Sequence, residues 1–238
     1  MHEYKGILAV FDGPDGAGKL TQARILQEWI QGKTKYADLI MTHEPWKSNE
    51  IKEKLAKDRD SYSDGLRMAE LFVDDRVKHT TQLIRPILDA GGIILCDRYT
   101  MSTCAYQWAQ GVNLPSLINM HKNRGILTPD ITFLLELKPE EASKRTLKRG
   151  EDLEKFEKDK SFVQKLINAY SCLGNMAQVD ESIFGKVVMI DANRTPEEIA
   201  LDIKDKFHSF YNIWEKQNLS VGYNQVKVQS IETVSKEG

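Results

Sequence analysis

Two hydrophobic patterns alternate along the chain. Uninterrupted apolar runs rich in β-branched residues occur at residues 6–11, 39–42, 93–97, 131–137 and 187–191. A strand that reads as a continuous apolar run is buried on both faces, as in the interior of a parallel sheet. These runs therefore predict five inner strands.

The stretches between these runs have the apolar spacing of helices. They cover residues 19–31, 64–90, 116–124, 139–149, 160–179 and 196–214. Strands that alternate with helices build folds in which helices cover both faces of a parallel sheet. The predicted fold class is therefore α/β, with a five-stranded parallel sheet between helices.

The predicted domain organisation is a single domain over residues 1–211, because no linker or repeat interrupts the alternation. Residues 212–238 differ, since apolar residues recur there with a loose period of two among polar ones. An edge hairpin, a dimer arm and a loosely ordered end all fit that pattern. We favour the disordered or accessory interpretation of this tail.

Composition narrows the class of protein. Lys and Arg number 33 and Asp and Glu 35, so the net charge is −2 and no global basic field exists to hold nucleic acid or an anionic membrane. No apolar run approaches the ~20 residues that span a bilayer, and we recognise no signal peptide. The three cysteines are widely spaced and indicate neither a disulfide framework nor a zinc site, so we expect a cytoplasmic protein with reduced thiols.

The first predicted strand ends in a glycine-rich turn with the spacing of a phosphate-binding loop, in which four residues separate Gly13 from Gly18 and Lys19. Glycines let several backbone N–H groups point into one concavity, and the following helix adds its positive N-terminal partial charge. The candidate ATP-binding residues of this turn are Gly13, Pro14, Asp15, Gly16, Ala17, Gly18, Lys19, Leu20 and Thr21. A glycine-rich turn without a ligand is the alternative.

The position after Lys19 departs from that pattern. It usually carries a Ser or Thr hydroxyl that ligates Mg²⁺, and here it is Leu20. Thr21 follows, but successive helical residues point ~100° apart, so Thr21 does not simply take over. Because Mg²⁺ usually keeps several waters, we expect a water molecule to fill the vacant place.

Further motifs follow the other predicted strands. Residues 42–45 read Thr-His-Glu-Pro, residues 71–76 read Leu-Phe-Val-Asp-Asp-Arg, residues 96–99 read Cys-Asp-Arg-Tyr and residues 102–107 read Ser-Thr-Cys-Ala-Tyr-Gln. In this order and placement the motifs resemble those of the thymidylate kinase family, over about residues 5–210. The resemblance implies a P-loop nucleoside monophosphate kinase architecture with a lid, ATP and Mg²⁺ as cofactors, dTMP as acceptor, and a homodimer.

The resemblance assigns the base and sugar end of a dTMP site. Phe72 is expected against the thymine ring, Arg76 is expected to donate to a thymine carbonyl, and Gln107 is expected to read the remaining base edge. Tyr106 is expected under the sugar, where it leaves little room for a 2′-hydroxyl. The alternatives are core packing for Phe72 and Tyr106 and a solvated charged face for Arg76.

The resemblance also assigns the phosphate end. Arg98 is expected to grip the dTMP phosphate with its guanidinium fork, and Ser102 belongs to the same acceptor site. Asp15 is expected to accept a hydrogen bond from the acceptor's 3′-hydroxyl. Asp97 is the expected acidic residue near the metal, acting through water. A structural ion pair of Asp97 with Arg98 is the alternative.

Residues 139–160 are implied to form a lid over ATP, although composition alone favours a solvated helix with compensating charges. Arg145 matches the position whose guanidinium lies on the adenine. Some family members place a catalytic arginine in the phosphate loop where this chain has Gly16, so the lid residues Arg149 and Lys155 are expected to supply that charge. The catalytic candidates are Lys19, Arg98, Arg149 and Lys155.

Three positions differ from the usual family pattern. His43 stands where an arginine that helps to hold the acceptor phosphate is common, Trp46 where glycine is common, and Glu70 where an apolar residue is usual. Lys47 is a candidate to replace the missing charge. Two alternative functions therefore stay open: another (deoxy)nucleoside monophosphate kinase, and a nucleotide-binding homologue with weak activity because Leu20 replaces the magnesium-ligating hydroxyl. The segment 64–90 is the candidate dimer face.

Overall fold

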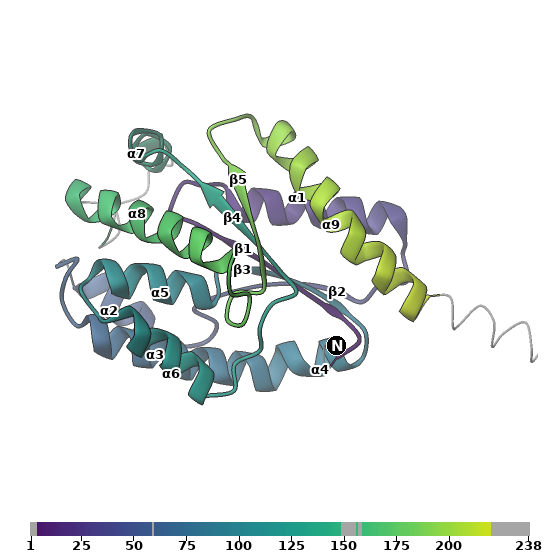
Figure 1. The fold of residues 1–238 in the computed structure, drawn as a ribbon, viewed down its shortest axis with the longest axis horizontal. Helices are drawn as coiled ribbons and strands as arrows, with labels where there is room; N and C mark the ends of the chain where they lie inside the picture. The colour runs from purple at the N-terminus through teal and green to yellow at the C-terminus, as the bar shows by residue number, and fades with distance from the viewer. Residues whose placement is uncertain (1–3, 59, 149–155, 157–158, 220–238) are drawn as a thin grey trace, which may run out of the picture.

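The computed structural model describes residues 4–58, 60–148, 156 and 159–219. Its centre is a five-stranded sheet with the order β2-β3-β1-β4-β5 and only parallel pairings (Figure 1). The strands are β1 (Ile7–Asp12), β2 (Leu39–His43), β3 (Ile93–Asp97), β4 (Ile131–Glu136) and β5 (Lys186–Asp191). The predicted fold class and all five predicted strands are confirmed.

Helices cover both faces of the sheet (Figure 1). They are α1 (Lys19–Lys33), α2 (Asn49–Lys57), α3 (Gly65–His79), α4 (Arg85–Asp89), α5 (Thr100–Ala109), α6 (Leu114–Asn123), α7 (Pro139–Lys148), α8 (Lys160–Ala177) and α9 (Pro196–Asn218), with the π-helical turn η1 (Thr80–Ile84) between α3 and α4. None of these helices, within the described residues, is long and apolar enough to cross a membrane.

The alternation of side chains along β1 divides the core in two. Ile7, Ala9 and Phe11 pack in the cluster that contains α1 and α9. Leu8 and Val10 point to the other face and pack with residues of η1, α4 and β3. Because both faces are covered, apolar residues are required at every position of the strand, which explains the uninterrupted run in the sequence.

Two helices were not foreseen from the sequence. In α5, residues 100–107 are all buried, so the helix has no polar face and lacks the amphipathic spacing by which helices are recognised. The other, α2, is short and highly charged, and Ile51 is its one fully buried residue. The single helix expected over 64–90 is instead α3, η1 and α4 in succession.

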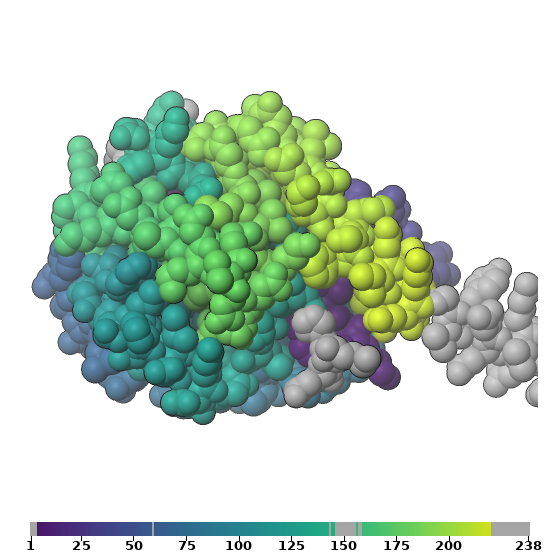
Figure 2. Space-filling view, in the orientation of Figure 1, coloured from purple at the N-terminus to yellow at the C-terminus, as the bar shows by residue number. Residues whose placement is uncertain are grey.

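The last helix extends beyond its expected end. α9 continues to Asn218, so residues 212–218, which the sequence assigned to the tail, are helical. Trp214 Nε1 donates to the carbonyl of Gly91 (2.6 Å), and Asn218 Nδ2 donates to that of Lys5 (3.2 Å). Figure 2 shows this end of α9 in yellow beside the purple N-terminal segment. The rest of the tail, residues 220–238, lies outside the described residues.

Candidate active site

The glycine-rich turn that the sequence predicted as a phosphate loop, and which keeps that name below, joins β1 to α1. Gly13, Gly16 and Gly18 have φ angles of 137°, 82° and 89°, which side-chain-bearing residues rarely adopt. Lys19 is buried, and its Nζ donates to the carbonyls of Gly13 (3.1 Å) and Pro14 (2.9 Å). Burial, and then the nearby Arg98 charge, lower the pKa of Lys19 to about 8.

The residues next to Lys19 and at the end of β3 show whether the chain could hold a magnesium ion. Leu20 and Thr21 are both exposed at the start of α1. Asp97 Oδ1, at the end of β3, is buried and has no hydrogen-bond partner among the described residues. A buried acceptor of this kind normally has a donor, so Asp97 is free to accept from a bound ligand or water. The same residues contain no cluster of three or more potential metal-ligating side chains. This donor set fits an ion held mainly by phosphate oxygens and water, with Asp97 accepting from a bound water.

Arg98 follows β3 and lies beside the phosphate loop with a left-handed backbone (φ 69°). One end of its guanidinium pairs with Asp15. The other donates to the carbonyl of Gly13 (3.2 Å) and to Ser102 Oγ (3.1 Å). Tyr106 Oη also donates to Asp15, at 2.8 Å. The loop carboxylate, the arginine and the tyrosine thus form one charged cluster at the end of the sheet.

Asp12 is a buried residue beside the loop that the sequence analysis missed. Its carboxylate is fully buried at the end of β1 and accepts from the backbone N–H groups of Gly13, Tyr99 and Ser102. It also accepts from Ser102 Oγ (2.6 Å) and Tyr170 Oη (3.0 Å). Burial raises the pKa of Asp12, and the hydrogen bond from Ser102 opposes that rise. Its position directly before the first loop glycine was the available signal.

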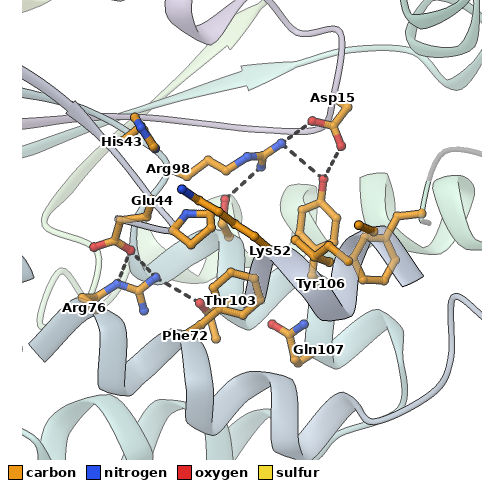
Figure 3. A pocket seen from close by; sticks show the side chains of 15 residues that line it. Asp15, His43, Glu44, Lys52, Phe72, Arg76, Arg98, Thr103, Tyr106 and Gln107 are labelled. Carbon is orange, nitrogen blue, oxygen red and sulfur yellow. Dashed lines mark hydrogen bonds and ion pairs between the residues drawn. The ribbon is translucent and has the colours of Figure 1, made fainter. Parts of the chain in front are cut away.

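A cavity of about 660 Å³ opens next to this cluster (Figure 3). Its lining contains all seven residues that the sequence analysis assigned to dTMP: Asp15, Phe72, Arg76, Arg98, Ser102, Tyr106 and Gln107. The remaining lining residues are His43, Glu44, Pro45, Lys52, Leu55, Ala56, Thr103 and Phe156. One cavity therefore brings together residues from the phosphate loop, from α2, α3 and α5, and from the turns after β2 and β3.

The end of the cavity away from the phosphate loop is suited to a flat heterocycle. Phe72 supplies an apolar face. Gln107 is fully buried, and its Nε2 donates to Gln110 (3.0 Å) while its Oε1 has no partner among the described residues. A buried carbonyl oxygen of this kind requires a donor.

Arg76 lies at the same end and is only 1% exposed. Its Nε donates to Glu44 (2.6 Å), its Nη1 contacts His121 Nε2 (2.7 Å), and its Nη2 donates to the carbonyl of Tyr99 and to Thr103 Oγ1 (both 3.0 Å). Arg76 is therefore a fixed, buried group and not part of a solvated charged face.

Two histidines complete the network around Arg76. Burial lowers the pKa of His121 to about 3, so the ring is neutral at pH 7. Its Nε2 can then accept from Arg76 while its Nδ1–H donates to the carbonyl of Leu117 (2.7 Å). His79 joins Glu44 (3.1 Å) to Thr42 (2.8 Å). Sequence reasoning missed this network because its members meet only in the folded chain.

Asp75 of α3 stabilises the turn after β2. The carboxylate of Asp75 accepts from the backbone N–H groups of Trp46 and Lys47. The Trp46 ring stacks on His79 with 5.0 Å between centroids, and Lys47 Nζ lies 3.8 Å above the Trp46 ring. Lys47, which the sequence suggested as a replacement charge, is not among the cavity-lining residues.

The expected lid begins with α7, which lies against the phosphate loop. A Cβ atom at Gly16 would come within 3.2 Å of the Ala142 carbonyl oxygen and 3.4 Å of Arg145 Cβ. Arg145 Nε donates to Glu141 (2.9 Å). The catalytic candidates Arg149 and Lys155 lie outside the described residues. Phe156 is described: it lines the cavity and contacts Tyr106, with 5.0 Å between ring centroids.

Comparison with known proteins finds relatives over most of the chain. The family model described as thymidylate kinase matches residues 11–203. A protein of Pyrococcus abyssi named "Probable thymidylate kinase" is 34% identical over 207 residues, which cover 84% of this chain and 94% of the relative. A thymidylate kinase of Desulfotalea psychrophila is 37% identical over 161 residues (66% of this chain, 77% of the relative). A thymidylate kinase of an Exiguobacterium species is 34% identical over 208 residues (84% and 93%).

The parallel sheet with a glycine-rich turn after β1 is consistent with a nucleoside monophosphate kinase, a class of phosphotransferase, and the matched family model and relatives place the chain in that class. Within that class, the matched residues and the identity over most of the chain settle the relationship. The chain belongs to the thymidylate kinase family.

Proposed function

We propose that the protein transfers the γ-phosphoryl group of ATP to dTMP, giving dTDP and ADP with Mg²⁺ as cofactor. The observation that carries the proposal is the cavity itself. One end of it has Arg98 and Asp15 beside the phosphate loop, and the other has Phe72, Arg76 and the unpartnered oxygen of Gln107 (Figure 3). A deoxynucleoside monophosphate has its charge and its base in that same order.

The base end favours thymine over cytosine. The N3–H of thymine is a donor that Gln107 Oε1 can accept, whereas N3 of cytosine is an acceptor and would face that oxygen lone pair to lone pair. Arg76 presents five N–H groups in all, and the one that its four partners leave can donate to a thymine carbonyl. Phe72 supplies the apolar face for the ring.

The sugar and phosphate then lie at the charged cluster. Asp15 accepts from the 3′-hydroxyl, and Tyr106 lies under the sugar and limits the room for a 2′-hydroxyl. Arg98 exchanges part of its contact with Asp15 for the phosphate oxygens, to which a guanidinium fork can donate twice.

ATP is placed by the phosphate loop. Its amides and Lys19 hold the β- and γ-phosphates, and Asp97 Oδ1, which lacks a partner among the described residues, would accept from a water of the metal ion. When bound, Mg²⁺ would neutralise part of the negative charge on the phosphate oxygens. Arg145 lies on the adenine, and Arg149 and Lys155 bring positive charge to the transferred group. An oxygen of the acceptor phosphate bonds to the γ-phosphorus while the bond to the β-phosphate oxygen breaks.

A substrate panel tests this function. Formation of ADP is measured with dTMP, dCMP, UMP and CMP as acceptors at equal concentration. We expect dTMP to have the highest kcat/KM, with dCMP at least about 100-fold lower because an unpaired buried polar group opposes it. Faster turnover of UMP or CMP than of dTMP would contradict the proposal. Tight binding of dTMP without turnover would identify a nucleotide-binding homologue instead.

A homodimer is part of the same proposal, with α3 as the candidate interface. Leu66 on this helix is an exposed apolar residue (54%), which a dimer would cover. Sedimentation velocity of the purified chain reports the mass directly, and a monomer at all concentrations would reject the dimer. The cytoplasmic location expected from the sequence remains a prediction.

A further inference from the structure

The charges around the acceptor cavity are unevenly paired. The lining carries three permanent cations and two carboxylates, which leaves an excess of one positive charge. Arg76 is paired with Glu44, and Arg98 is paired with Asp15. The third cation is Lys52, which forms no ion pair with any described residue and is exposed.

The position of Lys52 on α2 explains why it faces the cavity. Lys52, Leu55 and Ala56 have the i, i+3, i+4 spacing that places side chains on one side of a helix, and all three line the cavity. Ile51 is buried against Met68 and Leu71 of α3, which fixes the rotation of α2 about its axis. Lys52 therefore reaches the cavity because its helix is anchored, and not as a freely placed surface lysine.

A phosphate monoester needs more charge than the paired Arg98 offers. Its dianion would share Arg98 with Asp15, and position 43, which also lines the cavity, carries a histidine and not an arginine fork. Figure 3 shows Lys52 extending across the cavity with its ammonium group toward the side that holds His43 and Arg98. An unpaired ammonium group at this edge is available to a phosphate without the loss of an existing ion pair.

We propose that Lys52 is the second cation that binds the 5′-phosphate of the acceptor, so that a residue of α2 supplies a permanent charge in a chain that has no arginine at position 43. The inference rests on the proposed function, because it assumes a nucleoside monophosphate in the cavity. It assigns Lys52 to recognition of the phosphate alone, with no part in recognition of the base.

The test compares ligands with and without the phosphate. Binding of dTMP and of thymidine to the full chain is measured by calorimetry for the unmodified protein and for Lys52→Gln, Lys52→Arg, Lys47→Gln and Lys54→Gln. We expect Lys52→Gln to weaken dTMP binding about tenfold and to leave thymidine binding unchanged. Lys52→Arg should restore most of the dTMP affinity. The two control lysines lie on either side of Lys52 in sequence and outside the cavity lining, so their variants should bind both ligands normally.

Other outcomes would overturn the inference. Unchanged dTMP binding by Lys52→Gln, or an equal loss for dTMP and thymidine, would remove Lys52 from phosphate recognition. If the unmodified chain bound neither ligand, the proposed acceptor itself would be wrong, which is distinguishable from a loss confined to the variant.

Discussion

At the scale of single residues, burial changes the chemistry of Lys19. Its ammonium group is enclosed by the phosphate loop, and its pKa falls from the ordinary 10.5 to about 8. A nearby polyphosphate favours the charged form of an amine and would raise that pKa again. Between pH 8 and 10.5 the free protein therefore holds a largely neutral Lys19 and the nucleotide complex a charged one.

Nucleotide binding should consequently take up a proton in alkaline solution. Titration of ATP at about pH 9 in two buffers of different ionisation enthalpy should reveal uptake of nearly one proton per bound nucleotide. Lys19→Met should abolish the uptake, and Lys57→Met, an exposed lysine paired with Glu53, should retain it. Equal binding heats in both buffers for the unmodified chain would show that Lys19 is charged before ATP binds.

At the scale of elements, the geometry of the cavity depends on how α5 begins. Its N-cap residue, Tyr99, makes no side-chain capping bond, and Asp12 of β1 instead accepts from the N–H groups of Tyr99 and Ser102. A carboxylate at a helix N-terminus also interacts favourably with the helix dipole. One strand residue thus fixes the helix that presents Ser102, Tyr106 and Gln107 to the cavity.

Removal of the Asp12 carboxylate should destabilise the fold, because it joins the end of β1 to the start of α5. Asp12→Ala leaves several buried donors without a partner, each worth about 1–3 kcal/mol, so we expect the free energy of unfolding to fall by about 3–5 kcal/mol. Urea denaturation measures the loss. Asp12→Asn keeps one acceptor oxygen and should cost clearly less. Equal stability of the two variants would mean that the hydrogen bonds to Asp12 contribute little.

The same elements show what sequence can and cannot predict. The strands and the phosphate loop were predicted because uninterrupted apolar runs and glycine spacing are local properties. α5 was not, because a helix buried on all sides has no periodic signal. Lys52 and His121 were also missed, since their places depend on how α2 is anchored and on a contact with Arg76, 45 residues away in sequence.

At the scale of the whole molecule, two binding regions meet at one cluster. The phosphate loop holds Asp15, and Asp15 pairs with Arg98, which also lines the acceptor cavity. On the proposed function the donor and acceptor sites are therefore continuous, and a molecule that joins both substrates should occupy them together. Linkage makes the second contact intramolecular and raises affinity without any new interaction.

Thymidine joined through an oligophosphate to adenosine should accordingly bind at least about 100-fold more tightly than dTMP alone. Calorimetry measures the affinity, and both ATP and dTMP should compete with the compound. The matching cytidine compound serves as control and should lose most of the gain. Affinity no higher than that of ATP would show that the two regions cannot be filled at once.

The close approach of Gly16 to α7 has a consequence for how such chains diverge. A Cβ atom at position 16 would lie 3.2 Å from the Ala142 carbonyl oxygen, which is an unusually tight contact, and would touch the stem of Arg145. A lineage that acquires a larger residue there should therefore show a small outward shift of the facing helix. Positions 16, 142 and 145 should therefore covary among homologues. A larger side chain at position 16 should accompany smaller side chains at positions 142 and 145.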